Sequence, residues 1–178
     1  THMTAEETRR RAASGAGAGL APTTGADLGD GTFAARAYVD AHGAFGIGSD
    51  SNTSIDPFAE LRQLEWSQRL FLQARNVLAG ADAPVGQALY AAAARGGAQA
   101  QARPAGAIAA GCRADFVVLN ADDPALAAQP VDALLDAAIF GPCRQPVRDV
   151  MVGGRWVVRD GHHPHEDAVF ARYRASLA

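Results

Sequence analysis

Two short apolar stretches, each associated with a helical pattern, constrain the fold of this chain more than any other feature. The stretches "AGAGLAP" (16–22) and "AFGIGSD" (44–50) are small and apolar, as are strands that are covered on both faces. A helical segment at 32–43 separates them, and the run 23–31, which holds three glycines, is expected to be a loop. Two strand-then-helix units in succession predict an α/β fold with parallel strands and helical crossovers.

Capping signals and apolar spacing predict further helices. Thr4 and Glu7 have the T-x-x-E form of a capping box, which predicts a helix from about 5 to 13. Asp56 is an N-cap candidate followed by proline, and near-helical apolar spacing then continues to about Asn76. Helices are also expected at 84–95, 130–140 and 168–177, with 96–111 as a short helical turn and linker.

The character of the sequence changes after Gly111. The segment "CRADFVVLN" (112–120) has the β-branched and apolar residues of a strand. The segment 147–161 is expected to form two strands joined by a tight turn at Gly153-Gly154. We therefore expect a second, smaller β-containing domain from about residue 104, so that the chain divides into 1–103 and 104–178.

Composition and charge exclude several classes of protein. The chain has 178 residues, of which 48% are hydrophobic and 20% charged, as in soluble globular proteins. Its net charge of -3 provides no basic surface for nucleic acid, and no stretch is long and apolar enough for a membrane span. Cys112 and Cys143 are too few and too far apart for a disulfide framework or a cysteine zinc site. These features, and an N-terminus unlike a signal peptide, favour a cytoplasmic protein.

Asp50 is the strongest candidate for chemistry. It follows a strand-like stretch in which Gly46 and Gly48 allow close backbone approach, and Ser49 and Ser51 can donate hydrogen bonds to it. Catalytic groups of parallel α/β barrels lie at the carboxyl ends of strands, where an acid can bind a cation and exchange a proton. The alternative is an aspartate that caps the following loop through an Asx turn.

The five histidines are weaker candidates. His2 precedes a capped helix, where a strand-to-loop edge would lie in a barrel, but it can equally be a solvated terminal residue. His162, His163 and His165 fall in a proline-containing turn, for which we expect an exposed structural loop rather than catalysis. His42 lies at a predicted helix C-terminus, where a cation suits the helix dipole.

Four segments together resemble a known family: "GLAPTTGADLGDG", "FGIGSDSNTSIDPFAELRQLEWSQRL", "ADFVVLNADDPAL" and "VRDVMVGGRWVVRDGHH". They are similar to the C-terminal part of the amidohydrolase superfamily, and more narrowly to the formimidoylglutamate deiminases of histidine breakdown. The resemblance implies a metal-bearing (β/α)8 TIM-type barrel with a small β-sandwich domain. It makes 16–22 strand seven and 44–50 strand eight, and gives 104–178 to the sandwich with a closing helix.

The resemblance also implies a site and a reaction. Asp50 matches the strand-eight aspartate that binds zinc and transfers a proton from the attacking water to the departing ammonia. The substrate would be N-formimidoyl-L-glutamate and the product N-formyl-L-glutamate. The opening residues match the end of a strand-six segment "HATHMTAEE", which makes His2 its second histidine and a native residue.

The remaining metal ligands of the family belong to an N-terminal portion that this chain does not include. We therefore expect an enzyme fragment that alone holds no zinc and is inactive, whose missing partner is the N-terminal half of the barrel. The family also implies a homodimer and a small-molecule substrate.

Three positions depart from the family pattern. Gly25 and Asp27 stand where a glutamate and an asparagine are usual, and Asn52 replaces a histidine. These departures leave open another superfamily deaminase, acting on a purine or a guanidine-like substrate. A third possibility is a catalytically dead module that uses helix 57–76 as a dimer surface.

Overall fold

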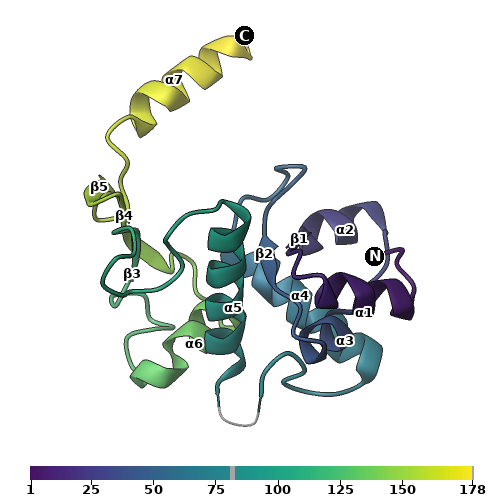
Figure 1. Ribbon diagram of the computed structural model, residues 1–178. Helices are drawn as coiled ribbons and strands as arrows, with labels where there is room; N and C mark the ends of the chain where they lie inside the picture. Colours follow the sequence, from purple (N-terminus) through teal and green to yellow (C-terminus); the bar gives the residue numbers. More distant parts are fainter. Residues whose placement is uncertain (81–82, 178) are drawn as a thin grey trace.

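The computed structural model describes residues 1–80 and 83–177 (Figure 1). In chain order its elements are α1 (Ala5–Ala13), β1 (Ala18–Leu20), α2 (Pro22–Leu28), α3 (Ala35–Asp40), β2 (Phe45–Ile47), α4 (Pro57–Leu72), α5 (Val85–Ala100), β3 (Phe116–Leu119), the 3-10 turn η1 (Val131–Ala133), α6 (Leu134–Phe140), β4 (Val147–Val152), β5 (Arg155–Val158) and α7 (Glu166–Ser176).

Strands β1 and β2 pair in parallel, which confirms the predicted βαβ arrangement. Ala18 lies opposite Phe45 and Leu20 opposite Ile47. One further backbone hydrogen bond extends the pairing at its carboxyl end, where the Gly48 N–H donates to the Leu20 carbonyl at 2.9 Å. The residues that follow the two strands therefore begin side by side at one edge of the sheet.

The expectation of a loop at 23–31 was wrong, because Pro22–Leu28 forms α2. Proline is well suited to the first helical turn, where its missing N–H has no partner to lose. Gly29 ends the helix in the left-handed conformation (φ 69°) that glycine adopts without steric cost. Pro22 and Gly29 therefore mark the first residue of α2 and its C-cap, where the sequence had suggested a loop.

Helix α5 is longer than predicted because it lies directly on β2. It continues through Gly96 and Gly97 to Ala100, although the pattern had suggested an end near residue 95. A Cβ at position 96 would overlap the backbone of Phe45, so the glycine is what permits the close approach of helix and strand.

Helix α4 lies at the centre of the N-terminal part. Its Asp56 cap is confirmed, with the side chain accepting a hydrogen bond from the Phe58 N–H at 2.8 Å. Leu61 and Leu64 are 1% and 2% exposed and belong to the hydrophobic core. The helix ends at Leu72, four residues before the predicted end, and its C-cap Gln73 is left-handed (φ 51°).

The C-terminal part contains an antiparallel sheet in the order β3-β4-β5. The predicted hairpin is confirmed, and Gly153 and Gly154 both have positive φ (58° and 79°) in the turn between β4 and β5. Helix α6 contacts α4 and α5, and its Ile139 is fully buried in the core shared with them. The domain boundary near residue 104 stays a prediction.

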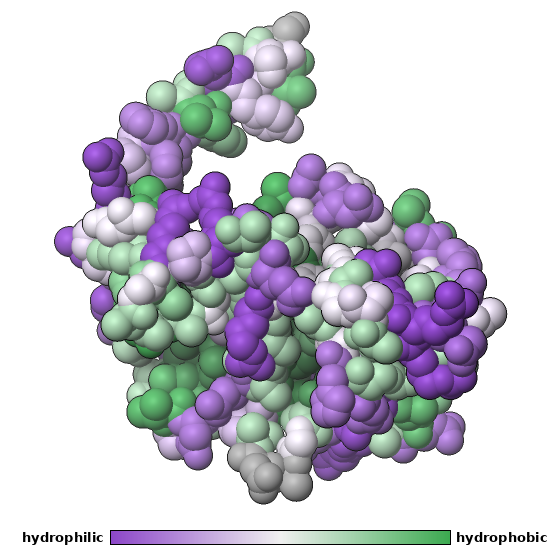
Figure 2. All heavy atoms as spheres, in the orientation of Figure 1, coloured by the Kyte–Doolittle hydropathy of each residue, from purple (hydrophilic) through white to green (hydrophobic). Residues whose placement is uncertain are grey.

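Helix α7 projects from the rest of the described chain and has no buried residue (Figure 1). Its apolar side chains Val169, Phe170 and Tyr173 are about 60% exposed and lie among charged ones (Figure 2). No helix within 1–80 or 83–177 is both long and apolar enough to cross a bilayer.

The contact between α5 and β2 can be tested with two neighbouring glycines. Gly96→Ala should destabilise the chain by about 2 kcal/mol, because the new methyl group meets the Phe45 backbone, which cannot move aside. Gly97→Ala is the matched control, since nothing lies within 4 Å of its added Cβ. The control should be neutral or stabilising by up to about 1 kcal/mol, as alanine has the higher helix propensity. Urea denaturation measures both, and equal effects would contradict the packing described here.

Candidate functional site

Asp50 lies at the carboxyl end of β2, three residues after Ile47. Its side chain is exposed and its backbone is left-handed (φ 48°), an uncommon conformation for a residue other than glycine. Among the hydrogen bonds of the described residues, none involves its carboxylate. Its Ser49 and Ser51 neighbours, expected to donate to it, bond elsewhere, so that expectation was wrong.

The two serine hydroxyls instead hold the loop together. Ser49 Oγ donates to Asn52 Oδ1 at 2.9 Å. Ser51 Oγ lies 2.8 Å from Thr24 Oγ1 and 3.2 Å from Thr53 Oγ1. An Asx turn would need the Asp50 carboxylate to accept a backbone N–H, and no such bond occurs in the part of the chain that the structure describes. The carboxylate is therefore free to face a ligand.

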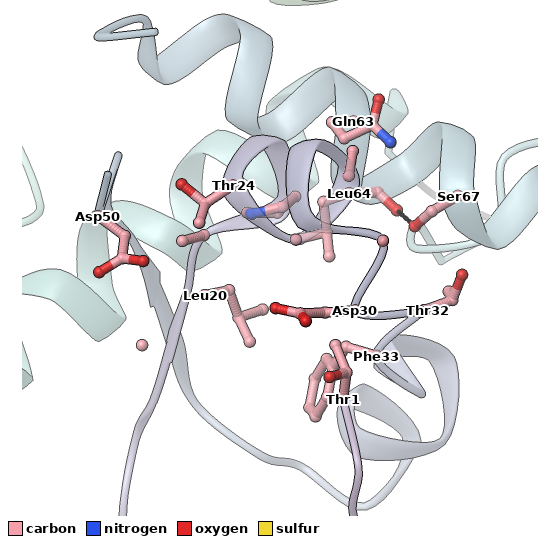
Figure 3. A pocket seen from close by; sticks show the side chains of 17 residues that line it. Thr1, Leu20, Thr24, Asp30, Thr32, Phe33, Asp50, Gln63, Leu64 and Ser67 are labelled. Atoms are coloured by element: carbon pink, nitrogen blue, oxygen red, sulfur yellow. Dashed lines mark hydrogen bonds between the residues drawn. The ribbon is translucent and has the colours of Figure 1, made fainter. Parts of the chain in front are cut away.

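Asp50 borders a cavity of about 520 Å³. Figure 3 shows Asp50 and Asp30 on either side of Leu20, with Thr24 at the end of the cavity nearest Asp50 and Thr32 and Phe33 at the other. The walls come from the end of β1, from α2 and the loop after it, and from α4. The cavity thus lies where the two parallel strands end, the position at which ligands bind in α/β folds.

The same carboxylate also borders a second hollow of about 560 Å³, which extends along both strands. This hollow is lined by small residues of β1 and β2 and by the glycines and last turn of α5: Gly17, Ala18, Gly19, Leu20, Ala21, Gly46, Ile47, Gly48, Gly96, Gly97, Ala100 and Gln101. Of the residues that the structure describes, Asp50 is the one charged residue that lines both spaces.

The three departures from the family pattern have different surroundings. Gly25 lines the cavity of about 520 Å³, and an added Cβ there would meet nothing within 4 Å, so the space next to its Cα is open. Asp27 is exposed and lines neither space. Asn52 adopts positive φ (56°), which asparagine tolerates better than most residues, and accepts the hydrogen bond from Ser49.

The histidines are not gathered around Asp50. His2 is exposed, although its neighbour Thr1 lines the cavity beside Asp50. His42 follows the end of α3, as predicted, and is exposed. His162, His163 and His165 are exposed in the turn before α7, which confirms the predicted loop.

Among the described residues, no group of three or more His, Cys, Asp or Glu side chains comes together, so these residues alone do not form a complete metal site. A carboxylate without protein hydrogen bonds suits a divalent cation as one ligand of a larger set. Burial and the neighbouring Asp123 raise the pKa of the Cys143 thiol to about 11, so this thiol is protonated at neutral pH.

Two residues that the sequence analysis did not select connect the loops around Asp50. Thr24 is buried and bonds to the residues on both sides of Asp50. Glu60 of α4 is 2% exposed, and its carboxylate accepts hydrogen bonds from the N–H and the hydroxyl of Thr23. The position of Thr24 in the sequence could have identified it, because Thr24 follows the end of β1 much as Asp50 follows the end of β2.

Comparison with known proteins places this geometry in a family. Residues 1–157 match the Amidohydrolase family. The chain is 49% identical, over 168 residues, to the formimidoylglutamate deiminase of Pseudomonas aeruginosa, covering 94% of this chain and 37% of that protein. It therefore spans little more than a third of that relative's length.

Solved structures give the same picture. A crystal structure of an amidohydrolase from Brucella melitensis superposes with a TM-score of 0.90 at 45% identity, covering 99% of this chain and 39% of that one. An adenosine deaminase from Xanthomonas campestris with bound zinc superposes with a TM-score of 0.84 at 24% identity, with 99% and 40% of the two chains covered. The second likeness shows the fold alone.

The histidine turn before α7 can be tested through its ion pair. His162 Nδ1 lies 2.6 Å from Glu166 Oε1, and this hydrogen bond and charge raise the pKa of His162 and lower that of Glu166. The pair therefore contributes its full stabilisation of the turn between pH 4.5 and pH 6.5, which are the ordinary pKa values of Glu166 and His162. Its contribution is lost as pH rises through the raised pKa of His162 or falls through the lowered pKa of Glu166.

Glu166→Gln should lower the pKa of His162 back toward its ordinary value, as followed by NMR titration of the imidazole. Glu6→Gln is the control, because Glu6 pairs with Arg9 on the exposed face of α1. An unchanged His162 titration in Glu166→Gln would show that the pair does not form in solution.

Proposed function

Because the chain belongs to the amidohydrolase family, we propose that it is the C-terminal part of a metal-dependent enzyme that hydrolyses N-formimidoyl-L-glutamate to N-formyl-L-glutamate and ammonia. One observation carries the proposal. A carboxylate without a partner among the described residues, Asp50, lies at the carboxyl end of a parallel strand in a chain that is 49% identical to a formimidoylglutamate deiminase. The longer protein that contains this chain is called the parent enzyme.

In the parent enzyme β1 and β2 would be strands seven and eight of a TIM-type barrel. Residues 1–103 would belong to the barrel, and 104–178 would contribute strands β3 to β5 to the sandwich and end in α7. Two parallel strands cannot close a barrel, which needs eight. The N-terminal portion of the parent would therefore supply the other strands and the remaining metal ligands.

Asp50 would have two roles in this enzyme. One carboxylate oxygen would be a ligand to a divalent metal, for which zinc is the best candidate. The metal would supply Lewis-acid activation of the attacking water. The Asp50 carboxylate would accept the proton of that water and transfer it to the departing ammonia, and its lack of protein hydrogen bonds suits it to proton exchange.

The cavity beside Asp50 restricts how the substrate can lie. Its lining in the described chain includes Asp30 and Asp50 but no arginine, lysine or histidine side chain. An acidic wall favours the cationic amidine end of formimidoylglutamate and disfavours its two carboxylates. The groups that bind those carboxylates would thus come from the N-terminal portion of the parent.

Purines are a second substrate class to compare with formimidoylglutamate, because Gly25 borders the cavity. The family pattern has a glutamate there, and its absence leaves room and removes a charge. A purine such as adenosine is the natural competitor to assay, since it too is deaminated by amidohydrolase-type enzymes. We further propose that the parent enzyme is a homodimer, as the resemblance to the deiminases implies. The two widely spaced cysteines of this chain support a cytoplasmic location.

The role of Asp50 is tested by Asp50→Asn in the parent enzyme. Turnover of formimidoylglutamate, measured as ammonia release, should fall by about 10³-fold or more, because an amide neither accepts the proton nor ligates a metal as a carboxylate does. Circular dichroism should be unchanged, since no described residue donates a hydrogen bond to that carboxylate. Asp40→Asn is the control, because Asp40 pairs with Arg36 on the surface of α3. Normal turnover in Asp50→Asn would exclude the proposed role.

Substrate and metal are tested together with the parent enzyme and with residues 1–178 alone. The parent should contain zinc by elemental analysis and release ammonia from formimidoylglutamate much faster than from adenosine. Residues 1–178 alone should retain no stoichiometric zinc and release no ammonia, because one carboxylate does not complete a zinc site. If the parent turns over adenosine faster than formimidoylglutamate, the substrate class is a purine and the proposed substrate is wrong. If it turns over neither, the chain belongs to a catalytically dead module.

A further inference from the structure

A single buried hydroxyl connects the two loops at the carboxyl edge of the parallel sheet. Thr24 Oγ1, on the first turn of α2, donates to the Ser49 carbonyl at 2.9 Å. It accepts a hydrogen bond from the Ser51 N–H at 3.3 Å and lies 2.8 Å from Ser51 Oγ. Thr24 is 4% exposed, so water does not replace these bonds readily.

The direction of each hydrogen bond follows from proton counting. A threonine hydroxyl has one proton, and Thr24 gives it to the Ser49 carbonyl. The Ser51 hydroxyl must therefore be the donor in its contact with Thr24. Thr24 Oγ1 then donates once and accepts twice, which uses its whole hydrogen-bonding capacity.

These bonds bracket Asp50, which makes none of its own to the described residues. The residue before it is held through its carbonyl and the residue after it through its N–H and hydroxyl. Asp50 and Asn52 both have positive φ (48° and 56°), a conformation that costs about 1 kcal/mol or more for a residue with a side chain. Such a loop stays in place only if its surroundings hold it, and Thr24 supplies the bonds that do so.

Thr24 is itself held from α4. The buried Glu60 carboxylate accepts hydrogen bonds from the Thr23 N–H at 2.9 Å and from the Thr23 hydroxyl. It thereby satisfies a free N–H in the first turn of α2, a role that an N-cap side chain usually has and that Ala21 cannot perform. Glu60 thus holds the first turn of α2, and Thr24 in that turn holds the loop that carries Asp50. These hydrogen bonds connect α4 to the loop.

We propose that Thr24 is a positioning residue of the enzyme, which sets the orientation of the Asp50 carboxylate by tethering Ser49 and Ser51. The inference rests on the proposed function, because the orientation of Asp50 matters for turnover only if Asp50 acts there. It assigns Thr24 no contact with the substrate or the metal. Thr24 acts by aligning Asp50, so loss of its hydroxyl should lower kcat more than it changes KM.

The decisive variant is Thr24→Val, which keeps the shape of the side chain and removes the hydroxyl. In the parent enzyme it should lower kcat by about 10- to 100-fold with KM changed by less than about 3-fold, as expected for a misaligned catalytic group. Thr24→Ser, which retains the hydroxyl, should restore kcat to within about 3-fold. Thr8→Val is the matched control, because Thr8 is 1% exposed and its hydroxyl donates to the Thr4 carbonyl in α1.

A second measurement does not depend on activity. In residues 1–178, hydrogen exchange of the Ser51 amide followed by NMR should become about 10-fold faster in Thr24→Val and stay unchanged in Thr8→Val. If Thr24→Val leaves this exchange unchanged, the tether does not hold the loop and the inference is overturned.

The kinetic outcomes separate the inference from the proposed function. If Asp50→Asn is inactive while Thr24→Val and Thr8→Val have the same kcat, Thr24 is only structural and the inference fails alone. If Asp50→Asn keeps normal turnover, the proposed function fails, and Ser51 exchange still decides whether Thr24 holds the loop. Loss of kcat in Thr24→Val, recovery in Thr24→Ser and a normal Thr8→Val would support the inference.

Discussion

The parallel pairing of β1 and β2 is the constraint on which the rest of the structure depends. With Ala18 opposite Phe45 and Leu20 opposite Ile47, the two strands end at the same edge. The chain leaving β1 and the chain leaving β2 are then close enough for direct hydrogen bonds, although 25 residues separate Thr24 from Ser49. Every feature of the candidate site follows from that adjacency: the cavity, the exposed Asp50 and the tether beside it.

Helix α4 organises this edge through polar side chains that are buried. Glu60 holds the start of α2, while Glu65, fully buried, accepts hydrogen bonds from the Val77 and Leu78 amides at 2.8 and 2.9 Å. Gln68 donates to the Phe33 carbonyl at 2.8 Å. A buried carboxylate or amide is costly unless it is hydrogen-bonded, and here each meets backbone groups that also need partners. One helix therefore fixes three separate segments: the start of α2, the chain at Phe33 and the chain at Val77 and Leu78.

Signals that act within a few residues were reliable guides to structure. The Thr4–Glu7 capping box, the Asp56 cap and the Gly153-Gly154 turn were all predicted from the sequence, because each depends on groups close along the chain. The prediction of a loop at 23–31 failed because Glu60, 37 residues away, caps the helix that forms there. The length of α5 was underestimated because Gly96 packs against the Phe45 backbone, a contact that helix propensity does not include.

The sequence by itself determined the family, the parallel βαβ unit and the choice of Asp50, because those depend on local patterns and on motifs that can be recognised in order. Only the tertiary structure decided what surrounds Asp50. Its neighbouring serines are turned to Asn52 and Thr24 rather than to the carboxylate, because Thr24 and the Asp50 loop meet only when β1 and β2 pair. Which hydroxyl bonds to which partner depends on positions in space, and no spacing along the chain contains that information.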